Sequence, residues 1–265
     1  PDAWGRRVII NRLAGRAGED TNPAEPSELV YLLQSGSDRI GALDFQASPS
    51  VYVPRMPSEA SLDVLQTAAD RVERGLPLPQ DLATALQHGT PIGGARPKAC
   101  VTDEHNHLWI AKFPNQNDTS DVGAWEMLCH ELAVAAGVDM YPCEIRKYSS
   151  HHHTFLTKRF DRDGTQRIHF SSAMTQLGYY DGKHADGASY LEIAEFLTNQ
   201  GAQTKQDLAQ LWRRIVFNIA VSNTDDHLRN HGFLLTKNGW KLSPAYDLNP
   251  ITGKTGLHLN ISDLS

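Results

Sequence analysis

An apolar stripe that leads directly into an acidic loop is the feature that most restricts how this chain can fold. Apolar side chains recur at helical spacing at Leu208, Leu211, Trp212, Ile215, Val216, Ile219 and Ala220. This spacing predicts a helix with one buried face. The loop of residues 223–230 follows at once, and residues 232–235 and 240–242 then predict a strand, a turn and a second strand. The hairpin would return Asp247 toward Asn230.

Composition allows a folded chain with a buried core and excludes several classes of function. Of the 265 residues, 40% are hydrophobic, which is enough for one large domain or two lobes. A net charge of −6 and a pI near 6.0 give no general affinity for nucleic acid or an anionic membrane. The three cysteines lack C-x-x-C spacing, so neither a disulfide framework nor a zinc site is predicted. No apolar run approaches the roughly 18 residues of a membrane span, and we expect a cytoplasmic protein with no membrane partner.

Three polar side chains in the last third of the chain fit phosphoryl transfer. Asp225 and Asn230 have the D-x-x-x-x-N spacing of a kinase catalytic loop, and Asp247 follows the hairpin. Asp225 would take the proton from a hydroxyl group, while the amide and the second carboxylate would hold Mg²⁺. The alternative is a capped turn, because Asp and Asn side chains bond their own backbone, but the position of Asp247 favours function. Asp226 is expected to be structural or a solvated neighbour.

Lys112 lies late in an apolar strand, where an ammonium group without an anion would be costly. Nucleotide phosphates would supply that anion, and Glu126 on the following helix would hold the lysine as an ion pair. The alternative is a lysine on an edge strand that points to water.

The loop of residues 89–98 contains Gly93 and Gly94, which let backbone N–H groups approach phosphate oxygens, and its Arg96 and Lys98 add positive charge. The loop matches no standard phosphate-binding motif, and a plain turn is the alternative. His227 in the acidic loop is expected either to touch a nucleotide phosphate or to fix the loop through its ring nitrogens.

The order of the remaining elements predicts the fold class. Residues 39–45 predict a short strand, and two hairpins are predicted at 99–113 and 144–160. Helices are predicted at 122–136, where Gly137 ends the helix, and at 189–200, and residues 204–207 resemble a capping box. We therefore expect an α+β, two-lobed, kinase-like fold, in which an N-lobe with an antiparallel sheet precedes a mostly helical C-lobe.

This order also divides the chain into three parts. Residues 1–88 would be an accessory region or the approach to the N-lobe. Residues 89–160 would be the ATP-binding N-lobe, and residues 161–265 a helical catalytic C-lobe.

With these residues in place, the chain resembles the HipA family, the serine/threonine kinase toxins of bacterial toxin–antitoxin pairs. The matching pieces come in family order and are residues 1–7, 40–43, 93–98, 111–114, 158–162, 223–230, 242–247 and 258–264. The resemblance implies a kinase-like fold, distantly similar to that of phosphatidylinositol kinases, which binds ATP and Mg²⁺ between two lobes.

By position, the resemblance implies that Asp225 is the catalytic base, that Asn230 and Asp247 bind the metal, and that Lys112 binds phosphate. His227 would lie against the nucleotide. The other ATP-binding residues would be Gly93, Gly94, Ala95, Arg96, Pro97 and Lys98 over the phosphates, and the hinge Lys158, Arg159 and Phe160 at the adenine. Family members often carry an autophosphorylated serine before the glycine pair. Pro91 stands there in this chain, and Thr90 beside it is the candidate substitute.

The resemblance also implies a biological role. Phosphorylation of a cytosolic protein such as glutamyl-tRNA synthetase would arrest translation and growth and so lead to persistence. The expected partners are a helix-turn-helix antitoxin of the HipB type and, only through it, operator DNA. The family's small N-terminal subdomain and its final helices are expected to be missing from this segment, which implies that residues 1–88 are the remainder of an N-terminal subdomain and that the C-lobe is incomplete at its C-terminus. Two alternatives remain: a nucleotide-binding scaffold that acts mainly with the antitoxin in transcriptional autoregulation, and a kinase for a lipid or small molecule.

Overall fold

The computed structural model describes residues 2–17, 26–55, 60–86, 90, 92–180, 187–251 and 253–262. The chain forms two compact units. The first unit comprises Pro1–Ala124 and Cys143–Arg159, and the second unit comprises Trp125–Pro142 and Phe160–Ser265. The finer division into three parts remains a prediction.

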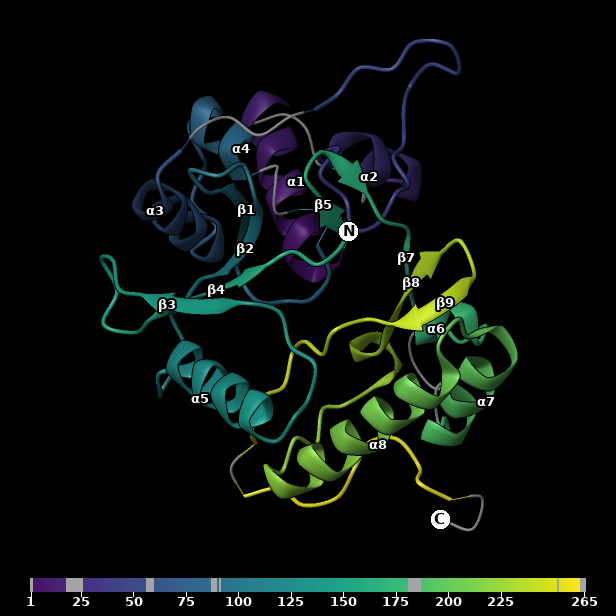
Figure 1. Cartoon of the computed structure of the whole chain (residues 1–265). Coiled ribbons are helices and arrows are strands. Elements are labelled where there is room, and N and C mark those ends of the chain that lie inside the picture. Colours follow the sequence, from purple (N-terminus) through teal and green to yellow (C-terminus); the bar gives the residue numbers. More distant parts are fainter. Residues whose placement is uncertain are drawn as a thin grey trace. The chain divides into compact units, whose positions relative to one another are not determined.

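The first unit contains a four-stranded antiparallel sheet (Figure 1). Its strands are β1 (Lys98–Thr102), β2 (Leu108–Lys112), β3 (Cys143–Arg146) and β4 (Thr154–Lys158). They lie in the order β1-β2-β4-β3, so β2 and β4 are the inner strands. Both predicted hairpins are confirmed, because β1 pairs with β2 and β3 pairs with β4.

Helices precede this sheet in the chain, namely α1 (Ala3–Ala17), α2 (Glu28–Gln34), α3 (Leu62–Glu73) and α4 (Gln80–Leu86). Helices α1, α3 and α4 share a core with the sheet, and α2 contacts α1. The Trp4 indole at the start of α1 donates a hydrogen bond to the Lys98 carbonyl over 2.9 Å, which ties that helix to β1. The shared core consists of Trp4, Val8, Leu65, Ala69, Leu86, Ala99, Ala111, Phe113 and Leu156, among others. Burial of each large apolar side chain is worth about 1.5–3 kcal/mol.

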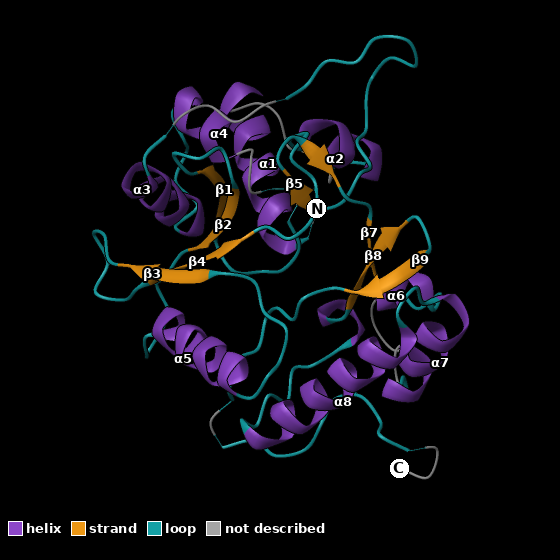
Figure 2. Ribbon diagram, viewed as in Figure 1, coloured by secondary structure: helices purple, strands orange, loops and turns teal. Residues whose placement is uncertain are grey.

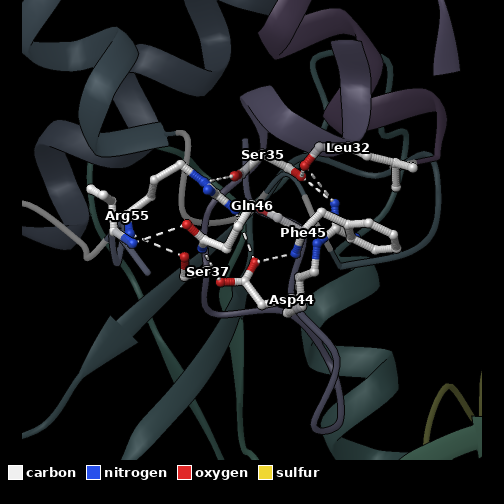
Figure 3. Close-up of polar contacts among 9 residues, drawn as sticks. Leu32, Ser35, Ser37, Asp44, Phe45, Gln46 and Arg55 are labelled. Carbon is white, nitrogen blue, oxygen red and sulfur yellow. Dashed lines mark hydrogen bonds and ion pairs between the residues drawn. The ribbon is translucent and has the colours of Figure 1, made fainter. Parts of the chain in front are cut away.

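Side-chain hydrogen bonds, not a strand, hold the segment between α2 and α3 (Figure 3). Residues 39–45 contain bends, and Gly41 has a left-handed φ of 74°, so the strand predicted there is wrong. Asp44 accepts hydrogen bonds from the Phe45 backbone (2.8 Å), Gln46 Nε2 (2.9 Å) and Arg55 (2.9 Å). A short acidic side chain that bonds its neighbours in this way competes with strand pairing.

The second unit contains most of α5 (Val122–Ala135) and the helices α6 (Ala173–Gln176), α7 (Tyr190–Gln200) and α8 (Thr204–Ala220). Gly137 follows α5 with a φ of 77°, as predicted. A capping box does form, but at α7, where Ser189 and Glu192 each bond the other's backbone N–H. The box predicted at 204–207 is wrong, because the Thr204 hydroxyl donates to the Leu197 carbonyl of α7 over 3.0 Å instead.

The strands of the second unit form two small antiparallel sheets (Figure 2). β5 (Arg162–Asp163) pairs with β6 (Gln166–Arg167), and β8 (Gly232–Thr236) lies between β7 (Phe170–Ser172) and β9 (Gly239–Leu242). The hairpin predicted after the acidic loop is therefore confirmed. The main core of this unit includes Ala173, Tyr190, Ile193, Leu197, Leu211, Leu228, Phe233, Leu242 and Leu259.

The apolar stripe of α8 splits into two rows. Leu211 is buried, and Leu208 and Ile215 pack against the same core. Trp212, Val216 and Ile219 are exposed by 64%, 44% and 54%. The seven apolar side chains together span a wider part of the helix surface than the one face of α8 that packs on α7 and β9. The prediction of one continuous buried stripe is therefore wrong for the second row.

Both units combine helices with antiparallel strands, and the predicted α+β class is confirmed. Within the described ranges of the chain, no helix is long and apolar enough to cross a membrane.

Candidate active site

The end of α8 delivers the acidic loop through a tight left-handed turn. Ser222 has a φ of 57°, and the Asn223 backbone N–H returns to the Asn218 carbonyl over 2.9 Å. A left-handed residue after the last helical turn is a common way to end a helix and redirect the chain. The loop then closes in a short 3₁₀ turn, η3 (Leu228–Asn230).

Asn230 folds back onto the residue predicted to be the base. Its side-chain Nδ2 donates to the backbone carbonyl of Asp225 over 3.1 Å, and its own backbone N–H donates to the His227 carbonyl over 2.8 Å. The amide nitrogen is therefore engaged, which leaves Oδ1 as the atom that a cation would use. Asp225 itself is exposed, as a group that must meet a substrate hydroxyl should be.

Asp247 lies on a segment that two hydrogen bonds tie to the acidic loop and to Ser222 just before it. The Tyr246 hydroxyl donates to the Arg229 carbonyl over 2.7 Å, and the Ile251 N–H donates to the Ser222 carbonyl over 3.1 Å. Asp247 has a left-handed φ of 60°, a conformation that costs energy in a residue with a Cβ and is often found at functional sites. The structure thus brings the segments of Asp225, Asn230 and Asp247 together within the second unit.

The described residues contain no group of three or more His, Cys, Asp or Glu side chains that could hold a metal ion alone. If Asn230 and Asp247 hold a metal ion as predicted, they would supply two oxygen ligands, and the rest would come from water or from a bound phosphate. That arrangement fits Mg²⁺, which is bound by few protein ligands and keeps water or phosphate oxygens around it.

Asp226, next to the predicted base, is buried and fully engaged. Its Oδ2 accepts hydrogen bonds from the Tyr190 hydroxyl (2.6 Å), Asn218 Nδ2 (2.7 Å) and His231 Nε2 (2.9 Å). Burial acts to raise the pKa of Asp226, but His231 and the Tyr190 hydrogen bond outweigh it, so the pKa lies below its ordinary value. Of the two roles expected for Asp226, the structural one is confirmed.

Arg214 is a buried residue beneath this site that the sequence reasoning missed. Its guanidinium donates to the Ser243 carbonyl, just before the segment of Asp247, and only 2% of the residue is exposed. Burial lowers the pKa of Arg214 to about 10, against the opposing effect of nearby acids that include Asp139 and Asp226. The sequence did offer a signal for it, because Arg214 is a charged residue that lies between the apolar positions Leu211 and Ile215 of α8.

His227 is half-buried, and its ring lies edge-on to His258 with 6.2 Å between centroids. Both roles considered for His227, contact with a nucleotide and fixation of the loop, remain predictions.

Lys98 and residues at the N-terminal end of the chain form hydrogen bonds with the backbone of the glycine loop in the first unit. Lys98 is only 4% exposed, and its Nζ donates to the Gly93 carbonyl over 2.5 Å. Gly94 has a φ of 97°, and its N–H donates to Asp2 over 2.8 Å. The Arg7 guanidinium donates to the Ala95 carbonyl over 2.7 Å. These contacts hold the loop in one conformation, and its role in phosphate binding remains a prediction.

Two members of this loop are paired or buried within the first unit, and the roles expected for them remain predictions. Arg96 forms an ion pair with Asp118, so its charge is balanced within the first unit. Thr90, the candidate autophosphorylation residue, has no exposed surface, and Pro91 lies outside the described residues.

Lys112 lies on an inner strand, so its interpretation as an edge-strand lysine is wrong. It is half-buried, and its Nζ lies 5.7 Å from the centre of the Phe155 ring. Lys98 is directly opposite Lys112 in the β1–β2 register, which places both side chains on one face of the sheet. Two like charges at directly opposed positions favour an anion nearby. Glu126 belongs to the second unit, and its pairing with Lys112 remains a prediction.

The predicted hinge begins where β4 ends at Lys158. The Arg159 side chain is buried and donates to the carbonyls of Asp38 (2.5 Å) and Arg39 (2.9 Å), while its backbone N–H donates to the Leu108 carbonyl. Phe160 begins the second unit, and its ring lies 5.8 Å from that of Tyr246. The role of these three residues in adenine binding remains a prediction.

Comparison with known proteins identifies the family. Residues 90–264 match the family model described as the HipA-like C-terminal domain. The chain belongs to the HipA family. Two relatives come from Sinorhizobium fredii: "Putative kinase Y4mE" is 32% identical over 148 residues, which are 52% of this chain and 33% of that protein. "Putative kinase Y4dM" is 26% identical over 249 residues, which are 89% of this chain and 58% of that protein. This HipA-family chain thus spans less than two thirds of the length of either relative.

The fold is similar to that of HipA in the complex of Shewanella oneidensis MR-1 HipA and HipB with operator DNA. That match has a TM-score of 0.67 at 19% sequence identity and covers 98% of this chain and 65% of the other. It confirms the predicted kinase-like α+β fold.

Proposed function

We propose that this HipA-family chain is the catalytic part of a serine/threonine protein kinase that uses ATP and Mg²⁺. The observation that carries the proposal is the contact of Asn230 with the Asp225 carbonyl, on a loop to which the segment of Asp247 is tied at both sides. These contacts support a site in which an exposed acid acts together with two oxygen-bearing side chains of the kind that Mg²⁺ prefers.

Each residue has a distinct task in the proposed reaction. Asp225 accepts the proton of the attacking hydroxyl, and Asn230 and Asp247 hold the metal. Mg²⁺, when bound, neutralises the charge of the transferred phosphoryl group. Lys112 and the glycine loop bind the phosphates, and positive charge there stabilises the transition state more strongly than in water.

We further propose a protein substrate and an antitoxin partner. The family relationship and the Shewanella complex, in which HipA is found with HipB and operator DNA, support a helix-turn-helix antitoxin of the HipB type. With a net charge of −6, the chain would reach operator DNA only through that partner. A cytosolic aminoacyl-tRNA synthetase, such as the glutamyl enzyme, is the proposed substrate. A scaffold role in transcriptional autoregulation and a lipid or small-molecule substrate are the alternatives.

The test is ATP-dependent labelling of proteins in a bacterial lysate, with glutamyl-tRNA synthetase added as a purified candidate. Asp225→Asn should reduce labelling by about 10²–10⁴-fold, because it removes the proton acceptor. Asp163→Asn, at another exposed acid of the second unit, should leave labelling unchanged. Equal labelling by wild type and Asp225→Asn would reject the role of Asp225. Nucleotide binding without any labelling would favour the scaffold.

A further inference from the structure

Three hydrogen-bond donors converge on one oxygen atom of Asp226, the residue that follows the proposed base. They come from α7 (Tyr190), from α8 (Asn218) and from the end of the acidic loop (His231), at 2.6, 2.7 and 2.9 Å. No more than 2% of any of these four residues is exposed. A buried carboxylate with three donors remains ionised and is rigidly held.

A second contact ties the start of the loop to the same network. Asn223 is 1% exposed, and its Nδ2 donates to Asn218 Oδ1 over 3.1 Å. The Asn218 amide thus accepts a bond from Asn223 with its oxygen and donates one to Asp226 with its nitrogen. Asn223 and Asp226, which lie on either side of Asp225 in the loop, are therefore both held by the side chain of Asn218 on α8.

The peptide bond between Asp225 and Asp226 links this buried network to the exposed site. The carbonyl of that peptide is the atom that accepts the Asn230 Nδ2–H bond. A change in the position of Asp226 must therefore rotate the peptide, and the rotation would move both the Asp225 side chain and the Asn230 amide.

We propose that Asp226 is a positioning residue for phosphoryl transfer: its bonds to Tyr190, Asn218 and His231 fix the peptide between Asp225 and Asp226 and so direct Asn230 Oδ1 toward the metal. The inference rests on the proposed kinase function. Partners that hold a ligand or a base in place typically contribute about 10–100-fold in metal affinity or activity.

The test removes one donor and keeps the volume of its side chain. Tyr190→Phe deletes the hydroxyl that donates to Asp226, while the ring can still pack edge-on against His231, 5.7 Å away. Tyr179→Phe is the matched control, because it deletes a Tyr hydroxyl that donates to a different carboxylate of the same unit, Glu192, over 2.8 Å. Hydrogen exchange of residues 223–230 and the Mg²⁺ concentration for half-maximal activity are measured in both variants.

Tyr190→Phe should lose protection in residues 223–230, require about tenfold more Mg²⁺ and show a lower kcat with little change in KM for ATP. Tyr179→Phe should match wild type in all three. Unchanged exchange in Tyr190→Phe overturns the proposal whatever the activity, and so does changed exchange with an unaltered Mg²⁺ requirement. If wild type transfers no phosphate, the kinase function fails and the positioning role falls with it, while the exchange data still decide whether Asp226 anchors the loop.

Discussion

The side-chain nitrogen of Asn230 lies 3.1 Å from the backbone carbonyl oxygen of Asp225. This contact decides which end of the Asn230 amide is available, because the nitrogen donates within the loop and the oxygen remains for a cation. The spacing of an acid and an amide five residues later therefore has a direct physical meaning here: the short loop lets the amide reach back to the peptide of the acid.

Asn230→Ala should remove both the internal hydrogen bond and the proposed metal ligand. We expect the rate of phosphoryl transfer to fall about 100-fold and the Mg²⁺ requirement to rise. The free energy of unfolding should fall by about 1 kcal/mol, as for loss of one hydrogen bond. Kinetics over a range of Mg²⁺ concentrations and thermal unfolding measure the two effects separately. A variant with normal Mg²⁺ dependence would contradict metal binding by Asn230.

Gly94→Ala should disturb the glycine loop through both backbone strain and a clash. The φ of 97° is unfavourable for alanine, and its Cβ would lie 2.8 Å from Lys98 Nζ, which holds the loop through the Gly93 carbonyl. We expect a loss of about 1–2 kcal/mol in stability and at least about tenfold weaker nucleotide binding. Calorimetric titration with ATP tests the second effect.

Gly75→Ala is the matched control for this prediction. Gly75 also has a left-handed φ, 67°, but nothing lies within 4 Å of the position that a Cβ atom would take there. It should show the strain without the effect on nucleotide binding. Equal binding losses in the two variants would mean that general destabilisation, not the loop, is responsible.

Local periodicity was sufficient to predict much of the fold. The hairpins β1–β2, β3–β4 and β8–β9, and the end of α5 at Gly137, follow from short-range patterns and are confirmed. The capping box shows the limit of such patterns. Both 189–192 and 204–207 have a hydroxyl residue followed by an acid three positions later, but Thr204 bonds Leu197 of the preceding helix instead.

Features that depend on distant residues were not predictable from the sequence. The spacing to Asn230 favoured Asp225 over Asp226 as the base, but the burial of Asp226 depends on its donors Tyr190, Asn218 and His231, of which Tyr190 is 36 residues away in the sequence. The burial of Arg214 and the exposure of Trp212 likewise depend on which face of α8 packs on its neighbours. Periodicity identifies an apolar face, whereas the tertiary contacts decide how much of it is covered.

Asp44→Ala should loosen the segment between α2 and α3. Burial acts to raise the pKa of Asp44, but hydrogen bonds from Ser37, the Phe45 backbone and Gln46 outweigh it and lower the pKa. Loss of this acceptor should cost about 1–3 kcal/mol, since Arg55 and the other donors would lose their partner. Hydrogen exchange of residues 43–55 should increase, whereas Asp63→Ala, an exposed acid in the first turn of α3, should leave it unchanged.

Acid should weaken the start of α5 through Asp121. Burial acts to raise the pKa of Asp121, but hydrogen bonds from the side chain and backbone of His153 and from the Ala124 backbone lower it below the ordinary 3.8. Because the folded-state pKa is the lower one, the stabilisation is fully present above about pH 3.8 and is lost as the pH falls through the folded value. The thermal midpoint should therefore drop in that range.

Two substitutions at this position separate the charge from the helix cap. Asp121→Asn keeps an acceptor for the Ala124 N–H, 3.1 Å away, but removes the negative charge next to His153 Nδ1, 2.5 Å away. Near pH 6 it should lower the thermal midpoint by at most a few degrees, about 1 kcal/mol or less, as for a partly exposed ion pair. Asp121→Ala also removes the acceptor for the Ala124 N–H at the start of α5, and it should lower the thermal midpoint further than Asp121→Asn does. The gap between wild type and Asp121→Asn should close as the pH falls through the folded-state pKa of Asp121, and a gap of constant size at every pH would show that the charge of Asp121 is not its source.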